Sequence, residues 1–186
     1  MTSPYLYFPG GRLSSAELTA ACLDGHLVAL GEGYIPADAV ETAALRAASL
    51  RELLPPGVAA THRSAAWIHG APAAPPARHR VQRVSARRLH HRIDRRLQFH
   101  DTRMPPADVV RIGGVLVTTP IRTLVDLTRT AGPGHRRAAL LMVQAGIADA
   151  EDAIAWLHAS PGLPGKRTAL PLLQAWASAD QPEVTR

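Results

Sequence analysis

The sequence predicts an α+β protein. A truncated winged-helix-like module (residues 1–37) is expected to precede a small mixed β-sheet domain packed with C-terminal helices (residues 38–178), followed by a tail (179–186). Three observations support this prediction. Short apolar runs bounded by glycine turns recur as far as residue 117, and apolar positions at helical spacing dominate from residue 120 onward. The apolar content of 46% is ordinary for a globular protein and is sufficient for a core.

A hairpin and the start of the next helix form the best-specified local structure. Two β-branched runs, Val109–Ile112 and Val115–Val117, flank Gly113-Gly114, a pair that tolerates positive φ at both turn positions. Thr119 can cap the following helix, and Pro120 suits its first position because the missing N–H would be unpaired there. The stretch is therefore expected to be a structural centre.

The C-terminal third is expected to be helical. In the helix that follows Pro120, Arg122 and Asp126 are four residues apart, so their side chains are expected to meet on the helix surface. Further helices are predicted over 135–145, 149–158 and 166–177, separated by glycine and proline turns.

The N-terminal residues suggest half of a winged helix-turn-helix. A helix over 13–23 precedes two short strands, 26–30 and 34–36, about the turn Gly31-Glu32-Gly33. A plain helix–hairpin packing unit fits the same pattern. Only about a dozen residues precede the helix, and residues 1–45 hold one arginine against five acids, so both length and charge argue against a groove-reading surface.

The middle of the chain predicts two helices and a link. One helix is expected over 38–54, capped by its first residue, then an extended link over 57–60 and a short helix over 61–70 that ends at a glycine. His62 and Ser64 invite a catalytic interpretation, but capping of this helix explains them better because no orienting third group is evident.

The positive charge is concentrated in one segment. Residues 78–103 hold nine arginines against two aspartates, a net charge of +7 in a chain of net charge +6. Strands are expected over 81–85 and 97–101, with a basic loop between them. Phosphate contact explains this density, and a charged sheet edge that resists aggregation is the alternative. The candidate DNA-binding residues are Arg78, Arg80, Arg83, Arg87, Arg88, Arg92, Arg95 and Arg96.

Other functions find little support. The single cysteine, Cys22, permits no internal disulfide, and neither a signal peptide nor a membrane-spanning run is evident, so a soluble cytoplasmic protein without membrane contact is expected. The histidines lack metal-ligand spacing, and no cofactor is expected. A hydrolase using His62, Ser64 and either Asp101 or Asp126 is disfavoured because paired carboxylates are missing.

Two blocks carry a family resemblance. The first runs from Thr61 to Gly70 and reads T-H-R-S-A-A-W-I-H-G, and the second runs from Val117 to Leu127 and reads V-T-T-P-I-R-T-L-V-D-L. They resemble the (S/T)-H-x-S-A-A-x-x-x-G and V-T-x-P-x-R-T-L-x-D-L blocks of the AbiEi family, the antitoxins of type IV toxin–antitoxin systems and related actinobacterial regulators. The motif residues, expected to be structural, are Thr61, His62, Ser64, Gly70, Thr119, Pro120, Arg122, Thr123 and Asp126.

The resemblance implies a function as well as a fold. Family members repress their operon by binding operator DNA through an N-terminal winged helix, here residues 15–35, and their partner is a nucleotidyltransferase-like toxin encoded nearby. This chain is expected to lack the endonuclease-like domain of longer relatives. The leading hypothesis is therefore a non-enzymatic DNA-binding regulator or antitoxin. The alternative is an antitoxin-like protein-interaction module of the same family that has lost the ability to recognise DNA.

Overall fold

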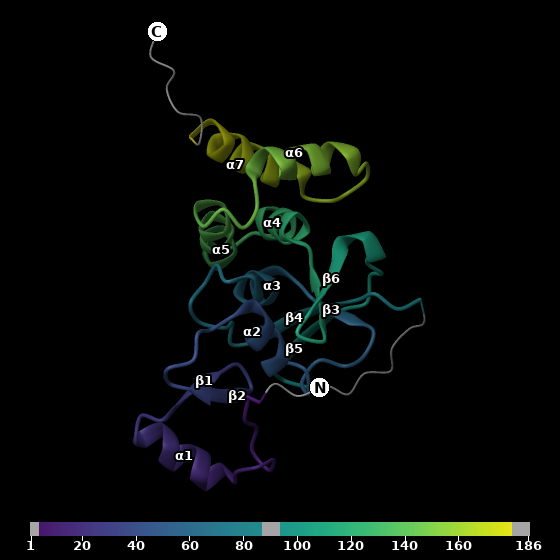
Figure 1. Cartoon of the computed structure of the whole chain (residues 1–186). Helices are drawn as coiled ribbons and strands as arrows, with labels where there is room; N and C mark the ends of the chain where they lie inside the picture. The colour runs from purple at the N-terminus through teal and green to yellow at the C-terminus, as the bar shows by residue number, and fades with distance from the viewer. Residues whose placement is uncertain (1–3, 87–93, 180–186) are drawn as a thin grey trace.

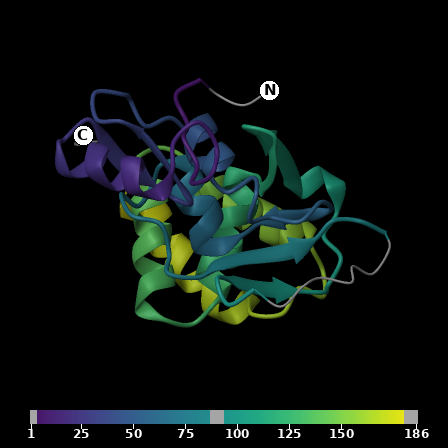
Figure 2. The same cartoon turned by 90° about the horizontal axis from the view of Figure 1, so that it is seen from below.

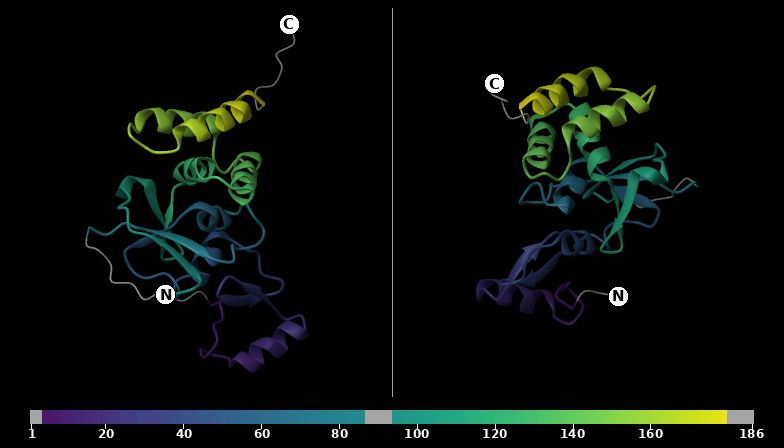
Figure 3. Two further views of the ribbon diagram at one scale, coloured as in Figure 1. Left: turned by 180° about the vertical axis from the view of Figure 1, so that it is seen from behind. Right: turned by 45° about the horizontal axis from the view of Figure 1, so that its top comes forward.

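A computed structural model describes residues 4–86 and 94–179. Three layers follow one another along the molecule: an N-terminal helix and hairpin, a five-stranded sheet with two helices, and four C-terminal helices (Figure 1). Views from behind and with the top turned forward keep the same order (Figure 3). The predicted α+β class with a mixed sheet is confirmed. None of the helices in the described part of the chain is long and apolar enough to cross a membrane.

The N-terminal unit consists of helix α1 (Ser15–Leu23) and the antiparallel strands β1 (Leu27–Leu30) and β2 (Gly33–Pro36). Ser14 caps α1 through a capping box with Glu17, which satisfies orphan backbone donors at both residues. A single described helix precedes the hairpin, as the shortness of this segment predicts. The winged-helix character of the unit stays a prediction.

The sheet follows the order β5-β4-β3-β7-β6. Its strands are β3 (Val58–Ala60), β4 (His79–Arg83), β5 (Leu97–His100), β6 (Val109–Ile112) and β7 (Val115–Thr118). β3 pairs with β7 in parallel and with β4 antiparallel, β4 pairs with β5 in parallel, and β6 and β7 form an antiparallel hairpin. Gly113 and Gly114 turn this hairpin with φ of +55° and +85°, which confirms the predicted turn.

Two expectations for residues 38–60 need correction. The helix is only α2 (Ala43–Ser49), and its cap is Thr42, whose hydroxyl accepts from the Leu45 N–H at 3.2 Å. The chain before it forms a turn, in which the Ala39 N–H donates to the Pro36 carbonyl. The expected extended link is β3, the central strand, whose three residues are all buried. A three-residue run buried on both faces shows no alternation, so periodicity could not reveal it.

Helix α3 (His62–His69) lies between two cores. Its Trp67 and Ile68 belong to the core formed by the five-stranded sheet, α2 and the β1–β2 hairpin, whereas Ala66 packs into the second core. The second core is formed by α4 (Pro120–Arg129), α5 (Pro133–Gln144), α6 (Ala150–Ala159) and α7 (Lys166–Ala179). In the view from below, β4 and β5 cross in front of these C-terminal helices (Figure 2). The two family blocks therefore meet at α3 and α4.

Candidate functional site

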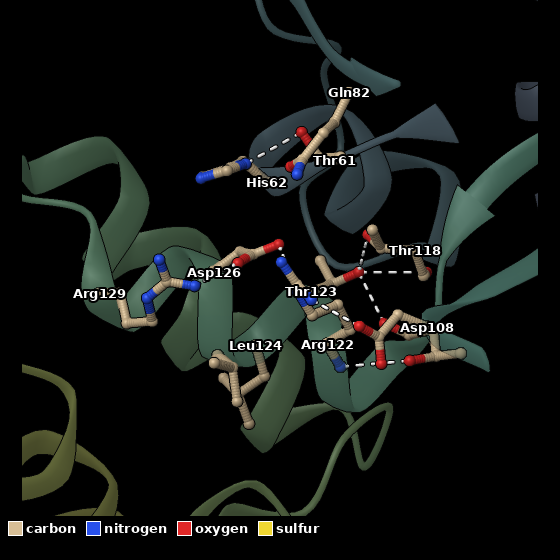
Figure 4. Close-up of polar contacts among 12 residues, drawn as sticks. Thr61, His62, Gln82, Asp108, Thr118, Arg122, Thr123, Leu124, Asp126 and Arg129 are labelled. Carbon is tan, nitrogen blue, oxygen red and sulfur yellow. Dashed lines mark hydrogen bonds and ion pairs between the residues drawn. The ribbon is translucent and has the colours of Figure 1, made fainter. Parts of the chain in front are cut away.

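A buried ion network holds the second family block (Figure 4). On α4, the Nε of Arg122 donates to Asp126 at 2.9 Å, and its Nη1 donates to Asp108 at 2.5 Å. Arg129 donates to the other Asp126 oxygen at 2.9 Å. The Arg122–Asp126 pair was expected on the helix surface, but its side chains are only 8% and 3% exposed. The helix face is covered by α6, whose Trp156 ring centroid lies 5.3 Å from the Arg122 guanidinium carbon.

This network connects separate elements of the fold. Asp108 belongs to the 3₁₀ turn Pro106–Asp108 before β6, so Arg122 joins α4 to the start of the hairpin. Burial raises the pKa of Asp126, while Arg122 and Arg129 act in the opposite direction. Both oxygens of Asp126 and one oxygen of Asp108 accept hydrogen bonds from arginines. The two carboxylates therefore stabilise α4 and its junction with the turn before β6.

The ends of α3 and α4 confirm three of the predicted motif roles and correct one. Thr119 caps α4 by accepting from the Arg122 N–H, Pro120 occupies its first position, and Gly70 ends α3 with φ of +103°. Ser64 was expected to cap α3. Its Oγ instead accepts the backbone N–H of Arg80 at 2.9 Å and so ties α3 to β4.

The capping expectation for His62 is also wrong. His62 is the first residue of α3, 8% exposed, and its Nδ1 lies 3.0 Å from the Thr61 hydroxyl. Its Nε2 lies 3.2 Å from the hydroxyl of Thr130, the residue that ends α4. Burial, helped by the nearby Arg80, lowers the pKa of His62 to about 2, so the ring is neutral at physiological pH.

His62 also has a strained backbone. Its φ of +52° is the only positive value at a non-glycine residue in the described part of the chain. Such a conformation costs on the order of 1–3 kcal/mol and persists only where surrounding contacts determine it. The contacts to Thr61 and Thr130 supply that constraint, so the first and second family blocks are joined through one imidazole.

Parallel pairing of β4 and β5 brings the two ends of the arginine-rich segment together. The His79 N–H donates to the Arg96 carbonyl at 2.7 Å, and the Arg78 guanidinium donates to the Leu97 carbonyl at 3.1 Å. Arg78 therefore lies beside Arg95 and Arg96 at the amino ends of both strands. Arg87, Arg88 and Arg92 lie outside the described residues.

Two arginines of the segment are engaged by carboxylates. Arg83 donates to Asp101 at 2.8 Å and to the carbonyls of Ser85 and Ala86, so it anchors the chain after β4. Arg96 pairs with Asp94 at 2.8 Å and with Glu32 in the β1–β2 turn. This pairing lowers the pKa of Asp94 to about 2. In the described ranges, no carboxylate pairs with Arg78, Arg80 or Arg95.

Two arrangements that catalysis often uses are a serine–histidine hydrogen bond and a group of metal-ligating side chains. No hydrogen bond joins Ser64 to His62, two residues that the structure describes, because each hydroxyl or ring nitrogen has another partner. Within residues 4–86 and 94–179, no group of three or more His, Cys, Asp or Glu side chains could hold a metal ion.

Sequence reasoning missed Asp108, Arg129, Thr130 and His135 as neighbours of the motif residues. Asp108 stood in the Pro-Pro-Ala-Asp lead before the hairpin, which was the only available signal. Arg129 lies three residues after Asp126 on α4, so the helical spacing could have revealed that pair. Thr130 and His135 could not be found in this way, because their proximity to His62 depends on how α3, α4 and α5 pack.

These elements define a class of protein: an α+β domain in which a five-stranded mixed sheet is tied by α3 to a four-helix layer, preceded by a helix–hairpin unit. The model of the AbiEi antitoxin C-terminal domain matches residues 58–155, more than half of the chain and inclusive of both blocks. The chain belongs to the AbiEi antitoxin family.

Comparison with curated proteins gives no match. Among solved structures, the chain is similar to the crystal structure of the RV2827C protein from Mycobacterium tuberculosis. The identity is 19%, the alignment covers 94% of this chain and 72% of that chain, and the TM-score is 0.47.

Proposed function

We propose that this AbiEi-family chain is a non-enzymatic DNA-binding regulator or antitoxin whose phosphate contacts come from the arginine-rich segment 78–96. One observation supports this most directly. Arg78 and Arg95 are exposed, adjacent through the β4–β5 pairing, and have no carboxylate partner among the described residues. The charge of the segment is therefore available to an external anion at this edge of the sheet.

The paired arginines of the segment have a different role in this proposal. Arg83 holds the chain that leaves β4, and Arg96 attaches β5 to the turn of the N-terminal hairpin. They position the basic segment next to the N-terminal unit. Exposed arginines then supply salt-dependent affinity, because each neutralised phosphate releases counterions.

The test is the salt dependence of binding to the DNA upstream of the gene, followed by fluorescence anisotropy. The logarithm of affinity should fall linearly with the logarithm of salt concentration. Arg78→Gln and Arg95→Gln should each reduce the slope by about 0.9, the value for one phosphate contact. Arg111→Gln is the matched control, since Arg111 is exposed on β6 at the opposite edge of the sheet. A flat salt response, or an equal effect of the control, would overturn the proposal.

A second candidate function is protein binding by the N-terminal unit. Helix α1 has no basic residue, and Leu23 and Val28 of this unit are 84% and 41% exposed. An acidic unit with exposed apolar side chains suits a protein partner better than a phosphate backbone. The partner implied by the family is a nucleotidyltransferase-like toxin encoded nearby.

Co-expression with the adjacent gene product tests this alternative. The two proteins should co-elute on size exclusion, and Leu23→Asp should abolish co-elution, whereas Thr19→Asp on the same helix is a charge-matched control. Retention of the complex by Leu23→Asp would exclude α1 as the contact. Absence of any complex with wild-type protein would exclude the function itself.

A further inference from the structure

Six imidazole and guanidinium groups from five elements gather around the beginning of α3. These elements are spread along the sequence from residue 62 to residue 144, so the grouping is a product of the fold. The members are His62 and Arg63 of α3, Arg80 of β4, His100 of β5, Arg129 of α4 and His135 of α5. We call this set the His–Arg cluster.

Direct contacts hold the cluster together. The His62 and His135 rings meet edge to face with centroids 5.9 Å apart. The Nε of Arg80 donates to Nε2 of His100 at 2.8 Å, so that ring nitrogen carries no proton. His62 forms the buried floor, whereas Arg80, His100, Arg129 and His135 are half-buried and therefore reachable from solvent.

Arg63 closes one side of the cluster and is itself exposed. Its guanidinium lies against Gly134, where a Cβ would come 3.3 Å from Nη1. The absence of a side chain at Gly134 thus allows Arg63 to approach α5 beside His135. Arg63 and His135 consequently present polar groups from two different helices.

The cluster has more positive charge than its carboxylates balance. Burial, and after it the positive charge of Arg80, lowers the pKa of His62, His100 and His135. Asp126 is the carboxylate that attracts Arg80 electrostatically, but both oxygens of Asp126 already bind Arg122 and Arg129. Asp108 is likewise bound to Arg122. Half-buried cations in this arrangement favour an anion.

The start of α3 adds a second, independent feature. Thr61 is the N-cap, yet its hydroxyl accepts no backbone N–H of the first turn and faces the His62 ring and the Arg80 carbonyl instead. The Ser64 N–H donates to the Thr61 carbonyl at 3.1 Å, whereas the N–H groups of His62 and Arg63 have no partner among the described residues. Such groups at a helix N-terminus favour negative charge through the helix dipole. The helix end and the cationic side chains therefore attract the same kind of ligand.

We propose that the His–Arg cluster is a binding site for one phosphate group of a small ligand, either free phosphate or the terminal phosphate of a nucleotide. Arg63, Arg80 and His135 bind the phosphate oxygens, and His62 forms the floor and holds α3 against α4. This site goes beyond the proposed DNA contacts, because it shares only Arg80 with the segment 78–96 and takes its other groups from α3, α4, α5 and β5.

The test uses the full chain with inorganic phosphate and, separately, a nucleoside triphosphate, at constant ionic strength set with chloride. Ring signals of His62, His100 and His135 in NMR spectra should shift and saturate at millimolar phosphate or below, while those of His26 and His158 stay in place. Calorimetry supplies the affinity. The nucleotide should bind more tightly than free phosphate if its terminal phosphate is the natural group.

Matched variants separate a built site from general charge attraction. Arg63→Gln and His135→Gln should each weaken phosphate binding about tenfold, the loss of one charge-assisted hydrogen bond. Arg137→Gln removes an exposed charge from the same helix α5 and should have no effect. Circular dichroism verifies folding of each variant. Unmoved ring signals, or equal weakening by Arg137→Gln, would overturn the proposal.

A duplex DNA experiment distinguishes this proposal from the DNA contacts. His135→Gln should leave DNA affinity unchanged, and phosphate should not displace DNA at fixed ionic strength. Displacement together with equal loss of both affinities in His135→Gln would assign the cluster to the DNA backbone and overturn the small-ligand site. Loss of phosphate binding with intact salt-dependent DNA binding refutes only the His–Arg cluster, and the reverse result refutes only the proposed function.

Discussion

The two glycines of the β6–β7 turn give a sharp test of how the fold is specified. Both have positive φ, so the local turn treats them alike. Their surroundings differ. A Cβ at Gly113 would overlap the Ala44 carbonyl oxygen and lie 3.0 Å from the Ala48 nitrogen, both in the backbone of α2. A Cβ at Gly114 would meet only the flexible Arg51 side chain, at 3.7 Å. We therefore expect Gly113→Ala to destabilise the protein much more than Gly114→Ala.

The magnitudes follow from two contributions. Positive φ costs alanine about 1–2 kcal/mol, and reduced freedom of the unfolded chain returns about 0.4–1 kcal/mol, which leaves about 1 kcal/mol for Gly114→Ala. Gly113→Ala adds the displacement of α2, about 1–3 kcal/mol for overpacking against atoms that cannot rotate away. Its total is therefore about 3 kcal/mol.

Thermal denaturation followed by circular dichroism measures the difference. At roughly 2–4 °C per kcal/mol for a chain of this size, Gly114→Ala should lower Tm by about 2–4 °C and Gly113→Ala by about 6–12 °C. Equal shifts for the two variants would refute the reasoning, since the turn conformation alone would then explain both.

Three further outcomes are expected. Burial lowers the folded pKa values of His62 (to about 2) and His79 (to about 4) below the ordinary value near 6.5. As the pH falls, both rings therefore become protonated in the unfolded chain before they do so in the folded protein. Stability is therefore full above pH 6.5 and should fall by about 2 kcal/mol per ring between pH 7 and 5, as measured by urea unfolding, and His79→Gln should reduce that loss. Asp126→Asn should cost about 3–5 kcal/mol in the same assay because it leaves Arg129 without a carboxylate and the buried Arg122 with Asp108 alone, and a cost below about 1 kcal/mol would contradict the architectural role. Glu32→Gln should change stability by less than about 1 kcal/mol yet raise low-salt DNA affinity severalfold in anisotropy titrations, whereas the exposed Glu151→Gln on α6 should do neither.

The family of this protein could be recognised from two short blocks because their residues act locally. Thr119 and Pro120 start α4, Gly70 ends α3, and Gly113-Gly114 turns the hairpin through backbone rules that operate within a few residues. These predictions needed no knowledge of the rest of the chain, and the structure confirms each of them.

Ser64, by contrast, was given a local role and proved to have a distant one. Its hydroxyl binds the backbone of Arg80, sixteen residues later, because β4 passes beside α3 in the folded sheet. The strand Val58–Ala60 went unrecognised for the same reason, since only its neighbours on both sides make it central.

By itself, the sequence determined the α+β class, the hairpin-to-helix unit, the family and the concentration of positive charge in residues 78–96. Only the tertiary structure decided which of those charges are neutralised, that the Arg122–Asp126 pair is buried, and that His62 lies beside Arg80 and His135. Caps and turns depend on neighbours in the chain, whereas burial and electrostatics depend on neighbours in space, and these are fixed only when the helices pack onto the sheet.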